Sequence, residues 1–159
     1  MKKTALALCL AIALGACGGE KKAQAPASLS AMEGILINGG RLVLPAVKGH
    51  PAAAYFTVSN QSGSVATLTG VTVAGAGKAE MHVTQDGIME AVPRLDIGTG
   101  QYATFGPGGN HAMVFDVSPA LKAGGTTDFT LTFSDGHKLT STLQIENPGM
   151  MGTMDHTKM

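Results

Sequence analysis

Cysteine is nearly missing from the chain, and tryptophan is missing altogether. The two cysteines, Cys9 and Cys17, both lie within residues 1–17. If a leader is cleaved there, the domain that follows has no disulfide and no free thiol. This excludes a disulfide-stapled fold and any metal site built on thiolate ligands. Aromatic residues make up only 4% of the chain, so valine, leucine, isoleucine and alanine must fill the core.

Long hydrophobic runs are missing as well. The apolar run near the N-terminus covers residues 5–14 and follows Lys2 and Lys3. A membrane-spanning helix needs about 20 such residues, so the run is typical of a signal peptide instead. The tetrapeptide Leu14-Gly15-Ala16-Cys17 resembles a bacterial lipobox, which predicts cleavage after residue 16 and lipidation of Cys17. An ordinary secretory signal cleaved nearby is the alternative.

Neither sign of charge is in excess. Lysine and arginine number 11, as do aspartate and glutamate, so the formal net charge is zero. Such a balance provides no footprint for nucleic acid or for an anionic membrane surface. We therefore expect membrane contact only through the lipid anchor. Because no acidic residue directly follows Cys17, the expected location is the periplasmic side of the outer membrane, in a cell with two membranes.

A convincing catalytic set is also missing. His137 lies near Asp135 and Ser134, but one tight hairpin cannot arrange a nucleophile, a base and an orienting group. No glycine-rich phosphate loop precedes a helix. The sequence therefore predicts a protein that is not an enzyme, with no catalytic or organic-cofactor residues.

What the sequence does contain is a series of short β-branched runs separated by turn signals. In residues 129–133, apolar side chains alternate with threonines, as in a strand with one buried face. Asp86-Gly87 and Asp135-Gly136 are strong hairpin signals. The pattern predicts a single all-β domain, a Greek-key β-sandwich. Its expected strands are 41–46, 53–59, 66–73, 78–84, 88–93, 101–105, 112–117, 128–134 and 138–146.

These signals divide the chain into four parts. They are a lipoprotein signal peptide (1–16), the lipidated cysteine with a flexible tether (17–34), a β-sandwich domain (35–147) and a mobile tail (148–159). The tail is a candidate metal-binding segment, because short tracts rich in methionine and histidine commonly bind metals. The alternative is a solvated end with incidental methionines. The tail residues in question are Met150, Met151, Met154, His156 and Met159.

The copper assignment comes from histidines and methionines in the second half of the domain. Met81 and His82 are adjacent, Met89 follows, and His111 and Met113 form a His-x-Met step. Thioether sulfur and imidazole nitrogen are neutral ligands that together favour Cu(I) over Mg²⁺ or Ca²⁺. With no thiolate present, a blue-copper electron-transfer centre is excluded.

Strand geometry selects among these residues. Side chains two apart on a strand point to the same face, so His111 and Met113 can hold one ion together. Met81 and His82 should point to opposite faces, and we take His82 as the ligand and Met81 as a less certain one. The hairpin at Asp86-Gly87 brings Met89 back beside the His82 strand. The predicted Cu(I) site consists of His82, Met89, His111 and Met113.

The same residues resemble those of a known family. Met89, followed after twenty-one residues by His111-Ala112-Met113, resembles the Met-x21-His-x-Met core of the PCuAC family. Residues 79–82 (Ala-Glu-Met-His) resemble the family's first ligand segment. Residues 107–111 (Pro-Gly-Gly-Asn-His) resemble its Pro-Gly-Gly-aromatic-His turn, and residues 51–58 its early Ala-Ala-Tyr strand. The resemblance covers residues 44–146.

This resemblance implies a cupredoxin-like fold and the role of a periplasmic copper chaperone. It implies that the receiver of the copper is the copper A centre of a cytochrome oxidase, with a thioredoxin-like assembly protein as a further partner. One departure affects the ligand set. Six residues separate His82 from Met89, where the family has about ten, and an alignment on Pro93 places the family's methionine at Ala91.

The function expected from the sequence is to bind Cu(I) and pass it on by ligand exchange. Cu(II) is a further option if the tail takes part. Two alternatives stay open. One is a lipoprotein that sequesters copper for resistance, with the tail as a sink. The other is a metal-free structural lipoprotein of the envelope, whose methionines only pack.

Overall fold

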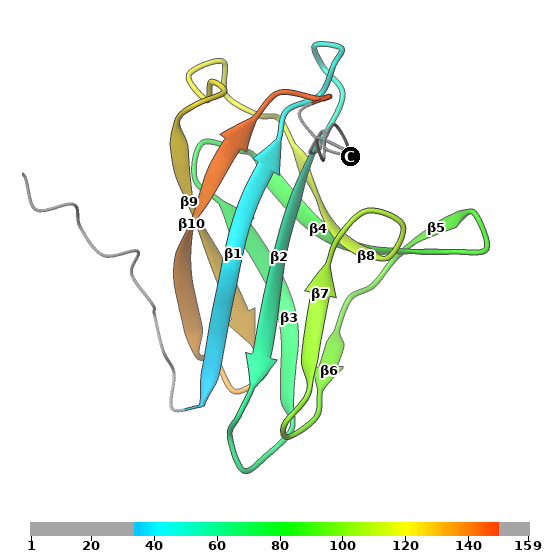
Figure 1. Ribbon diagram of the computed structural model, residues 1–159, viewed down its shortest axis with the longest axis vertical. Helices are drawn as coiled ribbons and strands as arrows, with labels where there is room; N and C mark the ends of the chain where they lie inside the picture. The colour runs from blue at the N-terminus through cyan, green and yellow to red at the C-terminus, as the bar shows by residue number, and fades with distance from the viewer. Residues whose placement is uncertain (1–33, 150–159) are drawn as a thin grey trace, which may run out of the picture.

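A computed structural model describes residues 34–149 of the chain (Figure 1). The predicted signal peptide, the lipidation site Cys17 and almost all of the predicted tether lie outside the described residues. So do the tail residues Met150, Met151, Met154, His156 and Met159. In the part that is described, no helix has the length and apolar character needed to cross a bilayer.

The described residues form ten strands joined by turns and short loops, so the prediction of a single all-β domain is confirmed. The strands are β1 (Ile35–Val43), β2 (Ala52–Asn60), β3 (Ala66–Val73), β4 (Lys78–Gln85), β5 (Ile88–Ala91), β6 (Leu95–Ile97), β7 (Tyr102–Phe105), β8 (Asn110–Phe115), β9 (Thr126–Phe133) and β10 (Lys138–Glu146).

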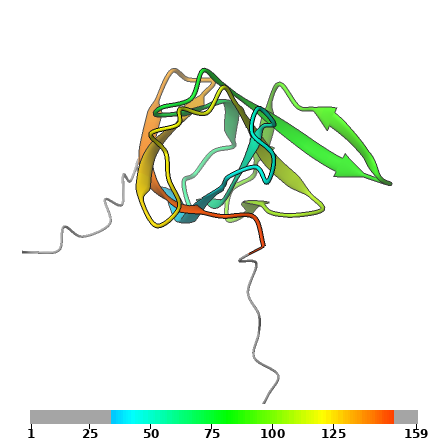
Figure 2. The same ribbon diagram turned by 90° about the horizontal axis from the view of Figure 1, so that it is seen from above.

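All ten strands belong to one continuous sheet, in the order β5-β4-β8-β7-β2-β1-β10-β9-β3-β6. The sheet curls on itself until β3 packs against β4, as the view from above shows (Figure 2). The two layers expected of a sandwich are therefore the facing halves of one curled sheet. Most neighbours are antiparallel, but β1 runs parallel to β10, and β7 runs parallel to β8.

A β-bulge in β1 helps the sheet to curl. The register of β1 against β2 shifts between Asn38 and Arg41, where Gly39 and Gly40 lie. Gly39 has a positive φ of 64°. At Gly40 a Cβ would meet the carbonyl oxygen of Thr142 at 2.8 Å. Only glycine allows both the left-handed backbone and the close approach of β10, and such bulges increase the local twist of a strand.

The core lies inside the curl and is built from alternate residues of each strand. In β2 every second side chain, from Ala52 to Asn60, is buried. The ring of Phe56 stacks on that of Phe105 with centroids 4.4 Å apart and lies 4.9 Å from that of Phe129. Burying a side chain of this size stabilises a fold by about 1.5–3 kcal/mol. Three phenylalanines thus compensate for the lack of tryptophan.

The β4–β5 hairpin projects away from the curled body (Figures 1 and 2). Its turn residues Asp86 and Gly87 both have positive φ, 52° and 78°. This is the backbone that a two-residue Asp-Gly turn requires, so the hairpin predicted there is confirmed. The hairpin matters for function because it extends β4 and β5 beyond the core while keeping them paired.

Candidate metal centre

Two predicted ligands face each other across neighbouring strands. His82 on β4 is directly opposite His111 on β8 in the antiparallel ladder. Their ring centroids lie 6.0 Å apart, with the ring planes inclined by 29°. The next pair along the ladder, Met81 and Ala112, is buried in the core. The two imidazoles therefore lie on the opposite face of the sheet from the core, side by side.

The other two predicted ligands share that face. Met113 is two residues from His111 on the same strand and stands opposite Glu80, two residues from His82. On the other side of β4, Ala91 stands opposite His82, and Met89 stands opposite Thr84. Since paired residues point to the same face, all four predicted ligands lie on one side of three adjacent strands. Met89 is the outlying member: it sits two positions nearer the turn and is 51% exposed.

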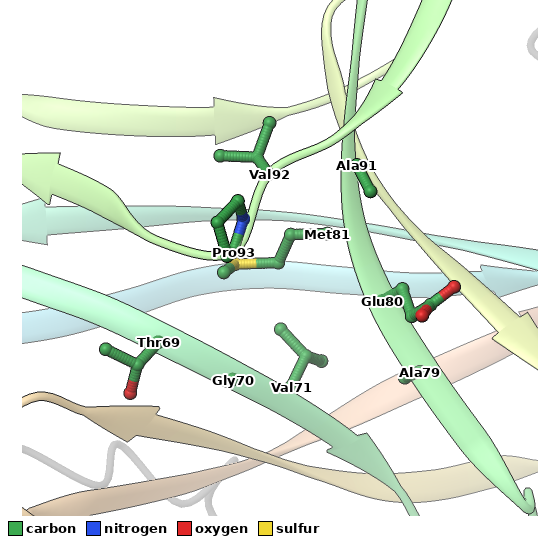
Figure 3. Close-up of a pocket in the computed structure, with 9 residues that line it drawn as sticks. All are labelled: Thr69, Gly70, Val71, Ala79, Glu80, Met81, Ala91, Val92 and Pro93. Atoms are coloured by element: carbon green, nitrogen blue, oxygen red, sulfur yellow. The ribbon is translucent and has the colours of Figure 1, made fainter.

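Met81, the less certain candidate, lies on the core side. It is only 5% exposed. Figure 3 shows its thioether beside Pro93 and above Val71, at a cavity of about 240 Å³ between β3 and β4. The carbonyl of Met81 accepts a hydrogen bond from the Val92 amide, which holds the chain beyond β5 against β4. The structure therefore separates Met81 from the face that carries His82.

The imidazole of His111 is held in one orientation by the loop before its strand. Its Nδ1 lies 2.9 Å from the carbonyl oxygen of Gly109, and the residue is buried, with an exposure of 7%. Because a carbonyl can only accept, Nδ1 must carry the proton, and Nε2 keeps its lone pair. The Gly109 carbonyl also accepts the Thr84 amide at 3.2 Å, so the same oxygen ties the loop to β4. Metal-binding histidines commonly have their second nitrogen fixed in this way.

The imidazole of His82 has no such partner. Both of its ring nitrogens are buried, and neither makes a hydrogen bond within residues 34–149. The nearest charged atom is Oε2 of Glu80, 3.6 Å from Nε2, which is beyond hydrogen-bonding distance. Buried polar atoms are normally paired, so an exception needs an explanation. A cation bound to one of these nitrogens would satisfy it.

Two charged side chains, Lys78 and Glu80, precede His82 on β4. Oε1 of Glu80 forms an ion pair with Nζ of Lys78 at 2.6 Å, and this interaction lowers the pKa of Glu80 below its ordinary value. Sequence reasoning gave Glu80 no role. The signal was present, because Lys78, Glu80 and His82 are alternate residues of one strand and so share a face.

The four predicted ligands on this face are thioethers and imidazoles, not carboxylates. Across residues 34–149, no group of three or more His, Cys, Asp or Glu side chains converges as a metal site. The two imidazoles share this face with the thioethers of Met89 and Met113, and such a combination is suited to Cu(I). The other histidines of the described segment are of another kind. His50 lies in an exposed turn, and His137 pairs with Asp135 at 2.9 Å on the surface.

Comparison with known proteins shows which family the chain belongs to and which solved structures share its fold. Residues 35–145 match the model of the LpqE-like family, which is named for an LpqE-like lipoprotein, and the chain belongs to that family. No curated protein sequence matches the chain significantly. Solved PCuAC domains share the fold of this chain over nearly their whole length, so the predicted resemblance to that family and its fold is confirmed.

Three solved structures illustrate the likeness. The copper-bound PCuAC domain from PmoF2 has a TM-score of 0.64 at 24% identity, and the alignment covers 74% of this chain and 97% of that one. The same domain without copper has a TM-score of 0.65 at 24% identity, covering 75% and 94%. The Cu(I) form of DR1885 from Deinococcus radiodurans has a TM-score of 0.60 at 26% identity, covering 80% and 85%.

Proposed function

We propose that this protein binds one Cu(I) ion on the outer face of β4, β5 and β8 and carries it to another protein. The observation that carries the proposal is the His82–His111 pair, whose rings lie 6.0 Å apart on the same face as Met113 and in which both nitrogens of His82 lack a partner among the described residues. Copper-bound PCuAC domains with the same fold support the assignment, and the DR1885 structure supports the Cu(I) state. The proposed ligands are His82, His111 and Met113, with Met89 as the fourth.

Release follows from the same ligand set. Neutral thioethers and imidazoles hold Cu(I) without an anionic ligand, so a partner that offers thiolates can displace them one at a time. Met89, half exposed on the projecting hairpin, is the ligand most accessible to such a partner. Binding and ligand exchange require no catalytic group, so the protein acts as a carrier and not as an enzyme.

The destination and the location belong to the proposal too. By resemblance, the receiver is the copper A centre of a cytochrome oxidase, reached directly or through a thioredoxin-like assembly protein. The name of the LpqE-like family supports a lipid anchor, which we assign to Cys17 after removal of residues 1–16. This would place residues 35–147 in the periplasm, held by the segment 17–34, with the Met/His-rich tail 148–159 at the other end.

A Cu(I) competition titration against a chromophoric chelator, without oxygen, tests the function. It compares the protein from Gly18 onward, a form that ends at Asn147, and the double variant His111→Ala/Met113→Ala. The variant His137→Ala, a histidine outside the cluster, is the matched control. One tight equivalent that survives removal of the tail and is lost in the double variant supports the carrier.

Other outcomes support the alternatives. Several weaker equivalents that disappear with residues 148–159 would indicate copper sequestration by the tail, the function that its five Met and His residues favour. Tight binding that persists in the double variant would show that Cu(I) binds at another site. If no form of the protein binds Cu(I), the methionines serve only to pack the fold. Met113→Leu should then leave every activity of the protein unchanged.

A further inference from the structure

The proposed copper ligands are all neutral, so the charge of the ion must be balanced by something outside the ligand set. Glu80 is the carboxylate that lies against the cluster. Its Oε2 is 3.6 Å from Nε2 of His82, and its backbone position is directly opposite Met113. The side chain is 36% exposed, so it is only partly in contact with water. Charges in partly buried positions interact more strongly than charges in bulk water.

Glu80 is also held by a cation. Nζ of Lys78 lies 2.6 Å from Oε1, while Oε2 stays on the His82 side. Lys78 is itself positioned over the ring of Phe115, 5.8 Å from the centroid. Because Lys78, Glu80 and His82 alternate along β4, the carboxylate stands between an ammonium group and the imidazole. Its negative charge is thus shared between Lys78 and whatever cation His82 binds.

We propose that Glu80 sets the charge balance of the copper site, and with it the preference of the site for Cu(I) or Cu(II), with Lys78 acting in the opposite direction. The inference rests on the proposed function, since it concerns the same site. The attraction of a carboxylate for Cu(II) is about twice its attraction for Cu(I) at the same distance. Glu80 therefore stabilises Cu(II) more than Cu(I) and lowers the reduction potential of the bound ion. Lys78 offsets that effect and keeps Cu(I) favoured.

Two variants test this through shifts of opposite sign. Glu80→Gln keeps the shape of the side chain but removes its charge, and Lys78→Gln removes the opposing charge. Glu80→Gln should lower the Cu(II) affinity more than the Cu(I) affinity, by roughly tenfold in their ratio. A tenfold change in the ratio raises the potential by about 59 mV for a one-electron couple. Lys78→Gln should shift the potential the other way.

The measurement is made on the full-length protein. The Cu(I) and Cu(II) affinities are obtained by competition, and the potential of the bound ion by redox titration with mediators. The control is Glu90→Gln, which makes the same charge change on β5. Glu90 stands opposite Val83 and so points to the face away from His82. Its potential should equal that of the wild type. Circular dichroism of each variant checks that the sheet is retained.

The outcomes separate this inference from the proposed function. If the wild type binds no Cu(I), the proposed function is wrong and the role of Glu80 is lost with it. If the wild type binds Cu(I) but Glu80→Gln leaves the potential unchanged, only the role of Glu80 is wrong. Shifts of the same sign in Glu80→Gln and Lys78→Gln would also overturn it, because they would reflect altered packing of β4 instead of charge.

Discussion

Two buried polar side chains of this domain differ sharply in how they are satisfied. Asn60, at the end of β2, is completely buried, and its amide donates to the carbonyls of Ser64 and Ile97, both at 2.8 Å. Its Oδ1 accepts bonds from the amide and hydroxyl of Ser62. His82, whose side chain is 15% exposed, has two buried ring nitrogens and no bond to either.

The difference separates a structural residue from a functional one. Each hydrogen bond of Asn60 closes the loops beside β2 and β6, and the protein alone accounts for all of them. The two nitrogens of His82 carry a desolvation cost that nothing in the described chain repays. A fold selected only for stability would place an apolar residue there. The cost is explained if a ligand binds at this position, as the cluster with His111 and Met113 suggests.

The largest effect on stability should follow from removing the hydrogen bonds of Asn60. Asn60→Ala leaves the carbonyl of Ile97 and the amide of Ser62 without their partner. Each buried group left unpaired costs about 1–3 kcal/mol. Chemical denaturation should therefore show a loss of several kcal/mol in the free energy of unfolding, with Cu(I) affinity of the folded protein unchanged. The control is Asn38→Ala, whose exposed amide makes only a 3.5 Å contact with Ser59 and whose loss should be small.

Removing the unpaired nitrogens of His82 should have the opposite effects, leaving stability unchanged or higher and weakening Cu(I) binding. His82→Leu removes two unpaired nitrogens and replaces them with apolar surface, a change that is commonly neutral or stabilising. We expect unfolding to need the same or a higher denaturant concentration. Cu(I) affinity should fall by at least the tenfold to hundredfold that loss of a supporting residue costs in metal sites. A variant that loses stability and keeps its affinity would show that His82 is a structural residue after all.

A third change tests which position of β5 completes the cluster. Ala91 stands directly opposite His82, and Met89 lies two positions farther toward the turn. Met89→Leu should weaken Cu(I) binding less than His82→Leu does, because Met89 is half exposed. Adding Ala91→Met should restore or exceed the original affinity, since the new thioether lies on the same ladder row as both histidines. Competition titration of the single and double variants measures this. A single Met89→Leu variant with full affinity would remove Met89 from the ligand set.

Short-range sequence patterns predicted the local elements of this molecule but not the way its sheet curls on itself. Both Asp-Gly hairpins and the alternating strand at 129–133 are where the sequence places them, because turn chemistry and two-residue periodicity act over a few residues. The start of β1 at Ile35 and the three-residue β6 were missed. Gly39 and Gly40 interrupt the first pattern, and the second is too short to show alternation. The curling of one sheet depends on contacts between distant strands, such as β1 with β10, which no local pattern contains.

For the site, the sequence predicted that His111 and Met113 share a face, but it could not predict that His82 pairs with His111. The spacing of His111 and Met113 is a property of one strand, so it could be interpreted directly. That His82 stands opposite His111 depends on the register of β4 against β8, which is set by the whole sheet. The role of Gly109 depends on a carbonyl, which carries no sequence signal. Glu80 could have been recognised from its alternation with Lys78 and His82.

The smallest effect is expected at a satisfied polar pair on the surface, which extends the comparison to a group that solvent can reach. Hydrogen bonds from the side chain and backbone of His137 lower the pKa of Asp135 from its ordinary value of 3.8. A carboxyl whose pKa is lower in the folded state stabilises the fold above its unfolded pKa, and this contribution disappears as the pH falls through the folded value. Asp135→Asn should therefore lower the melting temperature slightly near neutral pH and have no effect in strong acid. In a His137→Ala background only the backbone amide of residue 137 still donates to Asp135, so the effect of the substitution should shrink, and an undiminished difference there would mean that the imidazole is not the main partner of Asp135.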